Sequence, residues 1–211
     1  VAHLVGDGQR ILDCCAAPGG KTSLLADRNP NARIAAVEFH PHRAHLLRKL
    51  LRQNIRADGR NIDVIAADVR TPPFTTHFDR TLADVPCSGT GTLARNPEIK
   101  WRLVPQDFAN LQVRQLAILR AAMQRTEPGG IVVYSTCSLE REENEEVIDR
   151  VLAEDPSFHV FDCRNRLERL HAERELITSD FSSLLCGPYL RTLPGIHPCD
   201  GFFAATLERQ K

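Results

Sequence analysis

Two cysteines in this chain each follow a stretch that is typical of the end of a buried strand. Cys87 ends the run Asp-Val-Pro-Cys at residues 84–87, and Cys137 ends the run Ser-Thr-Cys at residues 135–137. Ligands of open α/β sheets bind beyond the carboxyl ends of the strands. If the two strands are neighbours, both thiols and the carboxylate of Asp84 face one crevice. A single buried cysteine is usually a small apolar residue, but two at adjacent strand ends indicate thiol chemistry.

A glycine-rich turn, Asp-Cys-Cys-Ala-Ala-Pro-Gly-Gly-Lys-Thr at residues 13–22, is the second candidate site. An apolar pair at residues 11–12 leads into it, and a helix-like run at residues 23–26 follows. In α/β proteins this order of strand, glycine turn and helix places a nucleotide against free backbone N–H groups at a helix N-terminus.

The turn does not match the phosphate-binding loop of an ATPase. That loop needs a glycine five residues before Gly20, where this chain has Cys15. The G-x-G-x-x-G pattern of dinucleotide sites is missing as well. An ATPase that uses Lys21, with Asp84 holding a metal, is the competing hypothesis, and it leaves both thiols without a task.

Acidic residues end the second and third predicted strands. Glu38 closes residues 34–38, about 20 residues past the glycine turn, where a carboxylate suits the hydroxyls of a ribose. Asp68 closes residues 62–68, where it could accept a hydrogen bond from an adenine amino group or cap a turn. The pattern favours an adenosine ligand without a polyphosphate.

Two thiols, a carboxylate and an adenosine-based cofactor fit methyl transfer to carbon-5 of cytosine. A thiolate that adds to carbon-6 makes carbon-5 nucleophilic enough to attack a sulfonium methyl group. A carboxyl group at the N3/N4 edge would hold the base and stabilise the adduct. A second thiolate can then remove the carbon-5 proton, so that the first is expelled.

The chain also resembles the Nop2/Sun family of RNA 5-methylcytosine methyltransferases, and within it the bacterial enzymes that modify small-subunit ribosomal RNA. The resemblance covers nearly all of the chain. Five segments carry it: C-A-A-P-G-G-K-T at 15–22, D-V-P-C-S at 84–88, N-P-E-I-K-W at 96–101, S-T-C-S at 135–138 and D-G-F-F at 200–203. It implies methylation of cytosine carbon-5 in RNA, first of all 16S ribosomal RNA, through a covalent cysteine–C6 adduct.

The resemblance further implies roles for single residues. In DNA cytosine methyltransferases the Pro-Cys thiol attacks, which would point to Cys87, but in the RNA family the Thr-Cys thiol does. Cys137 is therefore the expected nucleophile, Cys87 the group that removes the proton and allows release, and Asp84 the residue that positions the base. Lys21 would lie near the target base, or would be a helix-start lysine without a special task. The implied ligands of S-adenosylmethionine are Cys15, Ala16, Ala17, Pro18, Gly19, Gly20, Lys21, Glu38, Asp68 and Asp84.

The elements that must position these residues alternate between strands and helices, which predicts an α/β, Rossmann-like methyltransferase fold with a mostly parallel, doubly wound sheet. Two closing strands, at residues 187–193 and 202–207, have no helix between them and would form an antiparallel edge. The charged residues 164–174 are expected to form an excursion, and residues 164–183 have no assigned function. The expected strands lie at 34–38, 62–68, 79–85 and 131–134, and the expected helices at 41–56, 106–126 and 142–154.

Length and composition fit one catalytic domain over residues 1–211. The formal net charge is zero, so contacts with RNA must come from local patches. Seven cysteines without a C-x-x-C pair favour free thiols in a reducing cytoplasm. We expect a cytoplasmic monomer with no metal site and no membrane span. The family's RNA-binding extension before the first strand is expected to be absent from this chain.

Overall fold

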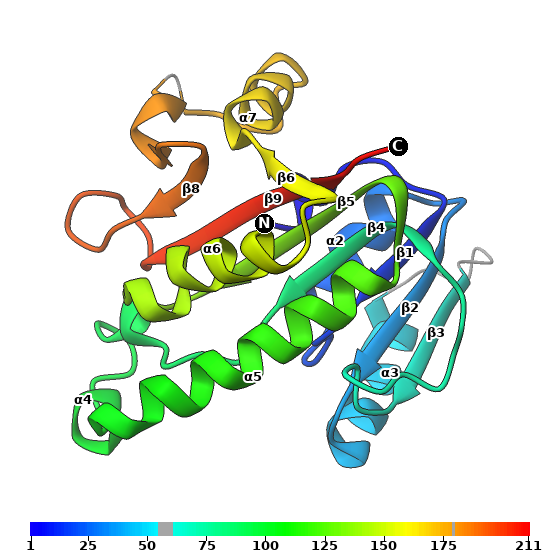
Figure 1. The fold of residues 1–211 in the computed structure, drawn as a ribbon, viewed down its shortest axis with the longest axis horizontal. Helices are drawn as coiled ribbons and strands as arrows, with labels where there is room; N and C mark the ends of the chain where they lie inside the picture. The colour runs from blue at the N-terminus through cyan, green and yellow to red at the C-terminus, as the bar shows by residue number, and fades with distance from the viewer. Residues whose placement is uncertain (55–60, 179) are drawn as a thin grey trace.

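A mixed β-sheet runs through the molecule, with helices on both of its faces (Figure 1). This computed structural model describes residues 1–54, 61–178 and 180–211. Within these residues the strands lie in the order β3-β2-β1-β4-β5-β9-β8-β7, and β6 also pairs with β9. The strands are β1 (Arg10–Asp13), β2 (Arg33–Glu38), β3 (Asn61–Ala66), β4 (Phe78–Asp84), β5 (Thr126–Thr136), β6 (Phe158–Phe161), β7 (Leu185–Cys186), β8 (Tyr189–Thr192) and β9 (Phe202–Arg209). The helices are α1 (Ala2–Val5), α2 (Gly20–Arg28), α3 (Pro41–Asn54), α4 (Ile99–Arg102), α5 (Pro105–Gln124), α6 (Glu145–Glu154) and α7 (Cys163–Ala172), with 3₁₀ turns η1 (Thr90–Thr92), η2 (Arg141–Glu143) and η3 (Phe181–Leu184).

The first five strands are parallel, so their carboxyl ends meet at one edge of the sheet. Asp84, the last residue of β4, pairs with Ser135 of β5. The loops after these two strands therefore leave the sheet side by side. This confirms that the two cysteine-bearing strands are neighbours.

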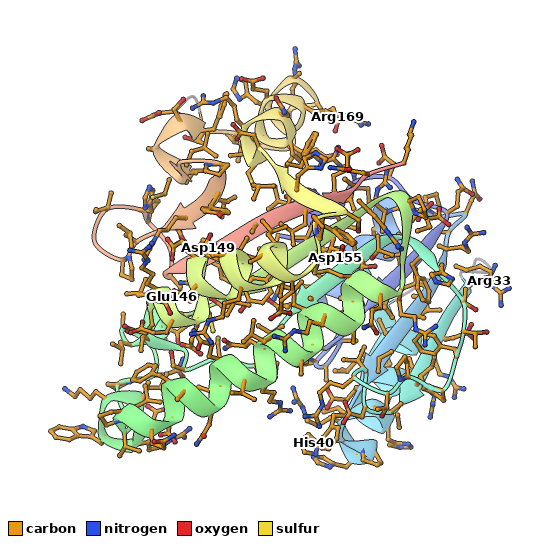
Figure 2. The ribbon with its side chains drawn as sticks, viewed as in Figure 1. Arg33, His40, Glu146, Asp149, Asp155 and Arg169 are labelled. Carbon is orange, nitrogen blue, oxygen red and sulfur yellow. The ribbon has the colours of Figure 1, made fainter. Side chains whose placement is uncertain are left out.

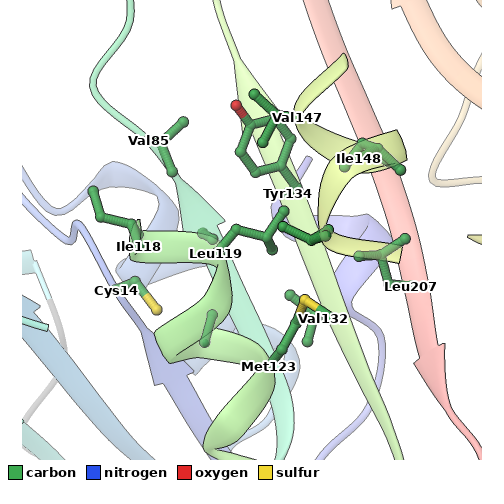
Figure 3. Close-up of a cluster of buried hydrophobic side chains, with 14 of the residues drawn as sticks. Cys14, Val85, Ile118, Leu119, Met123, Val132, Tyr134, Val147, Ile148 and Leu207 are labelled. Carbon is green, nitrogen blue, oxygen red and sulfur yellow. The ribbon is translucent and has the colours of Figure 1, made fainter. Parts of the chain in front are cut away.

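Apolar residues on both faces of the sheet fix the helices. Leu119 of α5 and Ile148 of α6 pack on one face together with Val132 of the sheet (Figure 3). Helices α1, α2 and α7 pack on the opposite face, where Leu25 and Leu167 are buried. No helix in the described parts of the chain is long and apolar enough to cross a membrane.

The C-terminal half of the sheet is antiparallel, as predicted. Strand β9 pairs along one edge with β5, and its other edge is shared by β8 near its start and β6 near its end. The prediction of an α/β, Rossmann-like fold with an antiparallel C-terminal edge is thus confirmed, but β6 was not predicted. The four residues of β6 form too short an apolar run to stand out from the loop after α6.

The boundary between α5 and β5 was predicted wrongly. Thr126 begins the strand and does not end the helix, because it pairs with Phe78 and its hydroxyl lies 2.9 Å from the hydroxyl of Thr81. Residues 128–130, predicted to break the helix before the strand, lie inside β5, where the register with β4 shifts. The extra residues form an irregularity in the strand, which a proline and two glycines tolerate.

Helix α3 also differs in part from its prediction. The predicted inward residues Leu47 and Leu51 are buried and Leu50 is partly buried, but Leu46 is half-exposed. Ala44 takes the inward position instead, three residues before Leu47. The predicted end at Arg56 lies outside the described residues.

The charged excursion predicted at residues 164–174 is mostly the regular helix α7. The carboxylate of Asp162 accepts a hydrogen bond from the N–H of Arg164 at 2.8 Å and caps the helix. Arg166 is buried and donates to the carbonyl of His3 at 2.9 Å. Arg169, labelled beside α7 in Figure 2, pairs with Asp7 at 2.6 Å. Composition alone suggested an excursion because it could not reveal these distant partners.

We expect Gly91→Ala to lower the free energy of unfolding by about 1–3 kcal/mol, because the new methyl group has no space. A Cβ at Gly91 would lie 2.3 Å from the carbonyl oxygen of Gly201 and 2.8 Å from that of Cys137. Gly20→Ala is the matched control, since no atom lies within 4 Å of its Cβ position. Urea unfolding measures both variants. Equal unfolding free energies for the two would contradict the packing described.

Candidate active site

A cavity of about 260 Å³ opens at the carboxyl edge of the parallel strands. The ends of β1, β2, β4 and β5 and the loop after β3 border it, together with one side of α5. Seven of the predicted site residues line it: Cys15, Ala17, Glu38, Asp68, Asp84, Cys87 and Cys137. The fold therefore brings the acidic strand ends and both thiols to one place.

The glycine turn divides between the cavity and the core. Cys15 and Ala17 line the cavity, whereas Ala16 is buried and donates its N–H to the carbonyl of Val37 at 2.9 Å. Gly19 has a φ of 114°, and a Cβ there would lie 2.6 Å from Leu47. Pro18, Gly19 and Gly20 do not belong to the cavity lining, and at Gly19 packing against α3 already requires the absence of a side chain.

A buried carboxylate under the turn ties β1 to α2. Asp13 ends β1 and accepts a hydrogen bond from the hydroxyl of Thr22 at 2.8 Å. Burial raises the pKa of Asp13 to about 6. This contact fixes the position of the turn relative to the end of β1, where Cys15 and Ala17 face the cavity.

Glu38 is held at the end of β2 with only 6% of its side chain exposed. One of its oxygens accepts the N–H of His40 at 2.9 Å, and Arg43 lies 3.7 Å away. Figure 2 shows His40 just beyond the end of β2, at the edge of the fold. A carboxylate oriented by backbone in this way is preorganised to accept further hydrogen bonds from a ligand.

Asp68 lies in the loop after β3, and its carboxylate forms a fork with the Arg70 guanidinium at 2.9 and 2.6 Å. The hydrogen bonds from Arg70 hold the pKa of Asp68 below its ordinary value. Asp68 also accepts the backbone N–H of Arg70 at 3.0 Å. Asp68 thus faces the cavity and also caps a turn.

The sulfur atoms of Cys87 and Cys137 lie 3.3 Å apart, and the N–H of Cys137 also points at the Cys87 sulfur at 3.3 Å. The thiols titrate as a pair. The hydrogen bond from Cys87 lowers the pKa of Cys137 to about 7, while the same contact and burial raise the pKa of Cys87. Cys137 is consequently the thiol that ionises first, with Cys87 as its hydrogen-bond donor.

Asp84 connects the thiols to Lys21. Its carboxylate lies 2.8 Å from the Lys21 ammonium and accepts the hydroxyl of Ser135 at 2.8 Å. Lys21 does not line the thiol cavity; it borders a second cavity, and its ammonium lies 5.7 Å from the centre of the Phe202 ring. The predicted helix-start lysine therefore bridges two cavities through Asp84.

The sequence analysis missed several residues of the cavity lining, among them Phe39, Arg43 and Arg114. Arg114 of α5 lies 6.0 Å from the centre of the Phe39 ring, so the two side chains close one side of the cavity. Phe39 follows Glu38 directly, and an aromatic residue next to a strand-end acid was a usable signal. Arg114 gave no signal, because an arginine within a long helix is usually a solvated residue. Among the described residues no group of three or more histidine, cysteine or acidic side chains could hold a metal ion.

Comparison with protein families identifies the chain. A family model described as 16S rRNA methyltransferase RsmB/F matches residues 4–208. The chain belongs to this family. It is 35% identical over 206 residues to ribosomal RNA small subunit methyltransferase B of Vibrio cholerae, a match that covers 96% of this chain and 42% of that protein. The chain thus spans less than half the length of this relative.

Solved structures agree with the fold. A methyltransferase homolog protein from Pyrococcus horikoshii is 29% identical, with a TM-score of 0.72, over 96% of this chain and 62% of the other. NSun6 from the same organism, solved with SFG, has a TM-score of 0.78 at 24% identity, over 99% of this chain and 50% of the other. Both likenesses extend over the antiparallel edge as well as the parallel strands.

We expect the alkylation rate of Cys137 by iodoacetamide to rise between about pH 6 and about pH 8 and then level off, because only the thiolate attacks. This range follows from a pKa of about 7, against 9.0 for an ordinary thiol. Peptide mapping by mass spectrometry follows Cys137 alone. In Cys87→Ala the midpoint should move upward, since the hydrogen-bond donor is lost. An identical midpoint in that variant would show that Cys87 does not act on Cys137.

Proposed function

We propose that this site transfers a methyl group from S-adenosylmethionine to carbon-5 of a cytosine in RNA, with small-subunit ribosomal RNA as the substrate. The observation that carries the proposal is the pair of thiols 3.3 Å apart beside Asp84. Membership in a family of 16S rRNA methyltransferases supports the choice of substrate. Methyl transfer to an oxygen or to an exocyclic nitrogen would leave two thiols in contact without a purpose.

The cavity fits S-adenosylmethionine, which supplies an electrophilic methyl group when bound. Glu38 would accept the ribose hydroxyls, and Asp68 would accept from the adenine amino group. Carboxylates at the ends of β2 and β4 suit a ligand that carries hydroxyl groups and a sulfonium charge. Cys15 and Ala17 would contact the ligand, whereas Ala16, Pro18, Gly19 and Gly20 would support the turn from outside.

Cys137 is the proposed nucleophile. Its lowered pKa makes a thiolate available near neutral pH. Addition of this thiolate to carbon-6 of cytosine forms a C–S bond and moves an electron pair toward carbon-5, which then attacks the methyl group. Asp84 would hold the N3/N4 edge of the base, and the ion pair with Lys21 would orient its carboxylate.

Cys87 is the proposed base for the last step. Its pKa is raised partly because it faces the Cys137 thiolate. Once that sulfur is bonded to carbon-6 its charge is gone, so the pKa of Cys87 falls and it can lose its proton to solvent. The Cys87 thiolate then takes the carbon-5 proton, and the returning electron pair expels Cys137.

A basic and aromatic surface beyond β4 supports RNA binding. Helix α4 carries Lys100, Trp101 and Arg102 in succession, and the Trp101 residue is 81% exposed. The Lys100 ammonium lies 5.1 Å from the centre of the Trp101 indole. An exposed indole between cationic side chains suits a stacked, unpaired base next to phosphates, and the target cytosine itself must be unpaired or flipped out.

Glu38→Ala is expected to weaken binding of S-adenosylmethionine by about 10- to 100-fold, because hydrogen bonds to a charged group contribute about 1.5–3 kcal/mol. Isothermal titration calorimetry with S-adenosylmethionine measures this. Asp63→Asn serves as the control, since Asp63 is a carboxylate of β3 that is 69% exposed. Unchanged affinity in a folded Glu38→Ala protein would remove Glu38 from the ligand site.

The two cysteines should differ sharply when each is removed. Cys137→Ala is expected to be inactive and to form no covalent complex with RNA. Cys87→Ala should still add to the base and methylate it, but it lacks the group that removes the carbon-5 proton, so a protein–RNA adduct should survive denaturing electrophoresis. Both variants should bind S-adenosylmethionine within about tenfold of the parent protein, since neither thiol holds the adenosine.

The reverse pattern, an adduct with Cys137→Ala and none with Cys87→Ala, would exchange the two roles. If neither variant traps a ribosomal RNA transcript and both stay active, the two-thiol mechanism is wrong for this chain.

A further inference from the structure

A fully buried carboxylate, Glu143, lies next to the loops that carry Cys87 and Cys137 and does not line the cavity. It ends the short turn η2 and is not among the candidate site residues of the sequence analysis. One of its oxygens accepts the backbone N–H of Ser88 at 2.9 Å and the side-chain amide of Gln115 at 2.8 Å. Its other oxygen accepts the hydroxyl of Ser88 in a short hydrogen bond.

These contacts hold the chain on both sides of Cys87. The Gln115 amide also donates to the carbonyl oxygen of Pro86 at 3.0 Å. Pro86 is thus fixed through Gln115, and Ser88 is fixed directly through its N–H and its hydroxyl. The backbone that carries the Cys87 thiol can therefore move only if hydrogen bonds of this set break.

The same network reaches the loop of the other thiol. The hydroxyl of Ser88 lies 3.1 Å from that of Ser138, the residue after Cys137. On the opposite side, the hydroxyl of Tyr134 donates to the carbonyl of Glu143 at 2.6 Å. Glu143 is therefore tied to β5 before Cys137 and, through Ser88, to the loop after it.

We propose that Glu143 is a positioning residue that holds the Cys87 thiol against Cys137, and so sets both the ionisation of the nucleophile and the reach of the base. The mechanistic half of this inference rests on the function proposed above. Burying a carboxylate is costly unless it is fully hydrogen-bonded. An apolar residue of similar size often stabilises a core equally well. The contacts of this carboxylate converge on residues 86–88. This indicates that the position of Cys87 must be fixed.

Glu143→Gln tests the proposal with little change in shape. The amide that replaces one oxygen cannot accept the Ser88 hydroxyl, so the loop around Cys87 is expected to shift. We expect the midpoint of Cys137 alkylation to rise by about one pH unit as the hydrogen bond from Cys87 weakens. The upper limit of this shift is the midpoint measured in Cys87→Ala.

A second readout uses the reaction itself. With Cys87 displaced, the adduct on Cys137 is released more slowly, so Glu143→Gln should accumulate about tenfold more protein–RNA adduct than the parent. Its affinity for S-adenosylmethionine should stay within about twofold of the parent, because Glu143 is outside the cavity.

Gln112→Leu is the matched control. Gln112 is also buried on α5, but it donates to the carbonyl of Glu142 at 2.5 Å and to the carboxylate of Glu146 at 3.3 Å. Within the described residues, neither of these hydrogen bonds reaches residues 86–88. The Gln112→Leu substitution loosens the packing of α5 against α6 but does not change the loops that carry Cys87 and Cys137. It should therefore match the parent in both the alkylation midpoint and the adduct level.

The outcomes separate the two proposals. A folded Glu143→Gln protein with the parent's alkylation midpoint, or a Gln112→Leu protein that shifts equally, overturns the positioning role of Glu143. Failure of both cysteine variants to trap RNA, with both still active, overturns the proposed two-thiol function. The alkylation midpoint of Cys137 in Glu143→Gln still tests the position of Cys87 in that case. If Glu143→Gln does not fold, Gln115→Met removes the donor to Pro86 and is held to the same expectations.

Discussion

The parallel pairing of β4 with β5 is the constraint on which the rest of the site depends. Because Asp84 pairs with Ser135, the residues that follow, up to Cys87 and Cys137, leave the sheet next to each other. A slip of one residue in this register would turn one thiol toward the opposite face of the sheet. The irregularity inside β5 lies near the start of the strand, at residues 126–131, and leaves the pairing near the thiols intact.

The acidic residues around these two loops differ in burial and in their partners. Asp13 is buried, which raises its pKa to about 6, and it accepts a hydrogen bond from Thr22. The Asp84 side chain is 25% exposed and forms an ion pair with Lys21. Glu38 lines the cavity and accepts a hydrogen bond from the backbone N–H of His40. The acids at the strand ends thus differ in what they can bind. One holds the fold together and the others remain available to a ligand.

Much of the parallel half and the location of the site could be predicted from the sequence, because strand ends with acids and cysteines are local signals. Ala16 and Gly19 were predicted as cofactor ligands, but both residues pack against α3. This packing already explains why they are small, and no local sequence pattern reveals it. Glu143 and Arg114 were missed for the same reason. The partners of the Glu143 carboxylate lie 28 or more positions away in the sequence, and Arg114 lies beside Phe39, which is also distant in the sequence. The helix α7 was missed because a row of charges gives no sign of the acids that neutralise it.

The place of β9 in the sheet has a consequence for how the protein is made. This strand is synthesised after every other strand of the sheet, yet it lies between β5 on one edge and β8 and β6 on the other. Until it emerges from the ribosome, β5 presents an unpaired edge to the cell, and such edges recruit other chains. A nascent chain at that stage already carries both thiol loops but cannot yet complete the sheet beside them. The sheet of this domain is therefore completed only by its last strand, and a chain truncated before β9 would expose the edge of β5 and be prone to association with other chains.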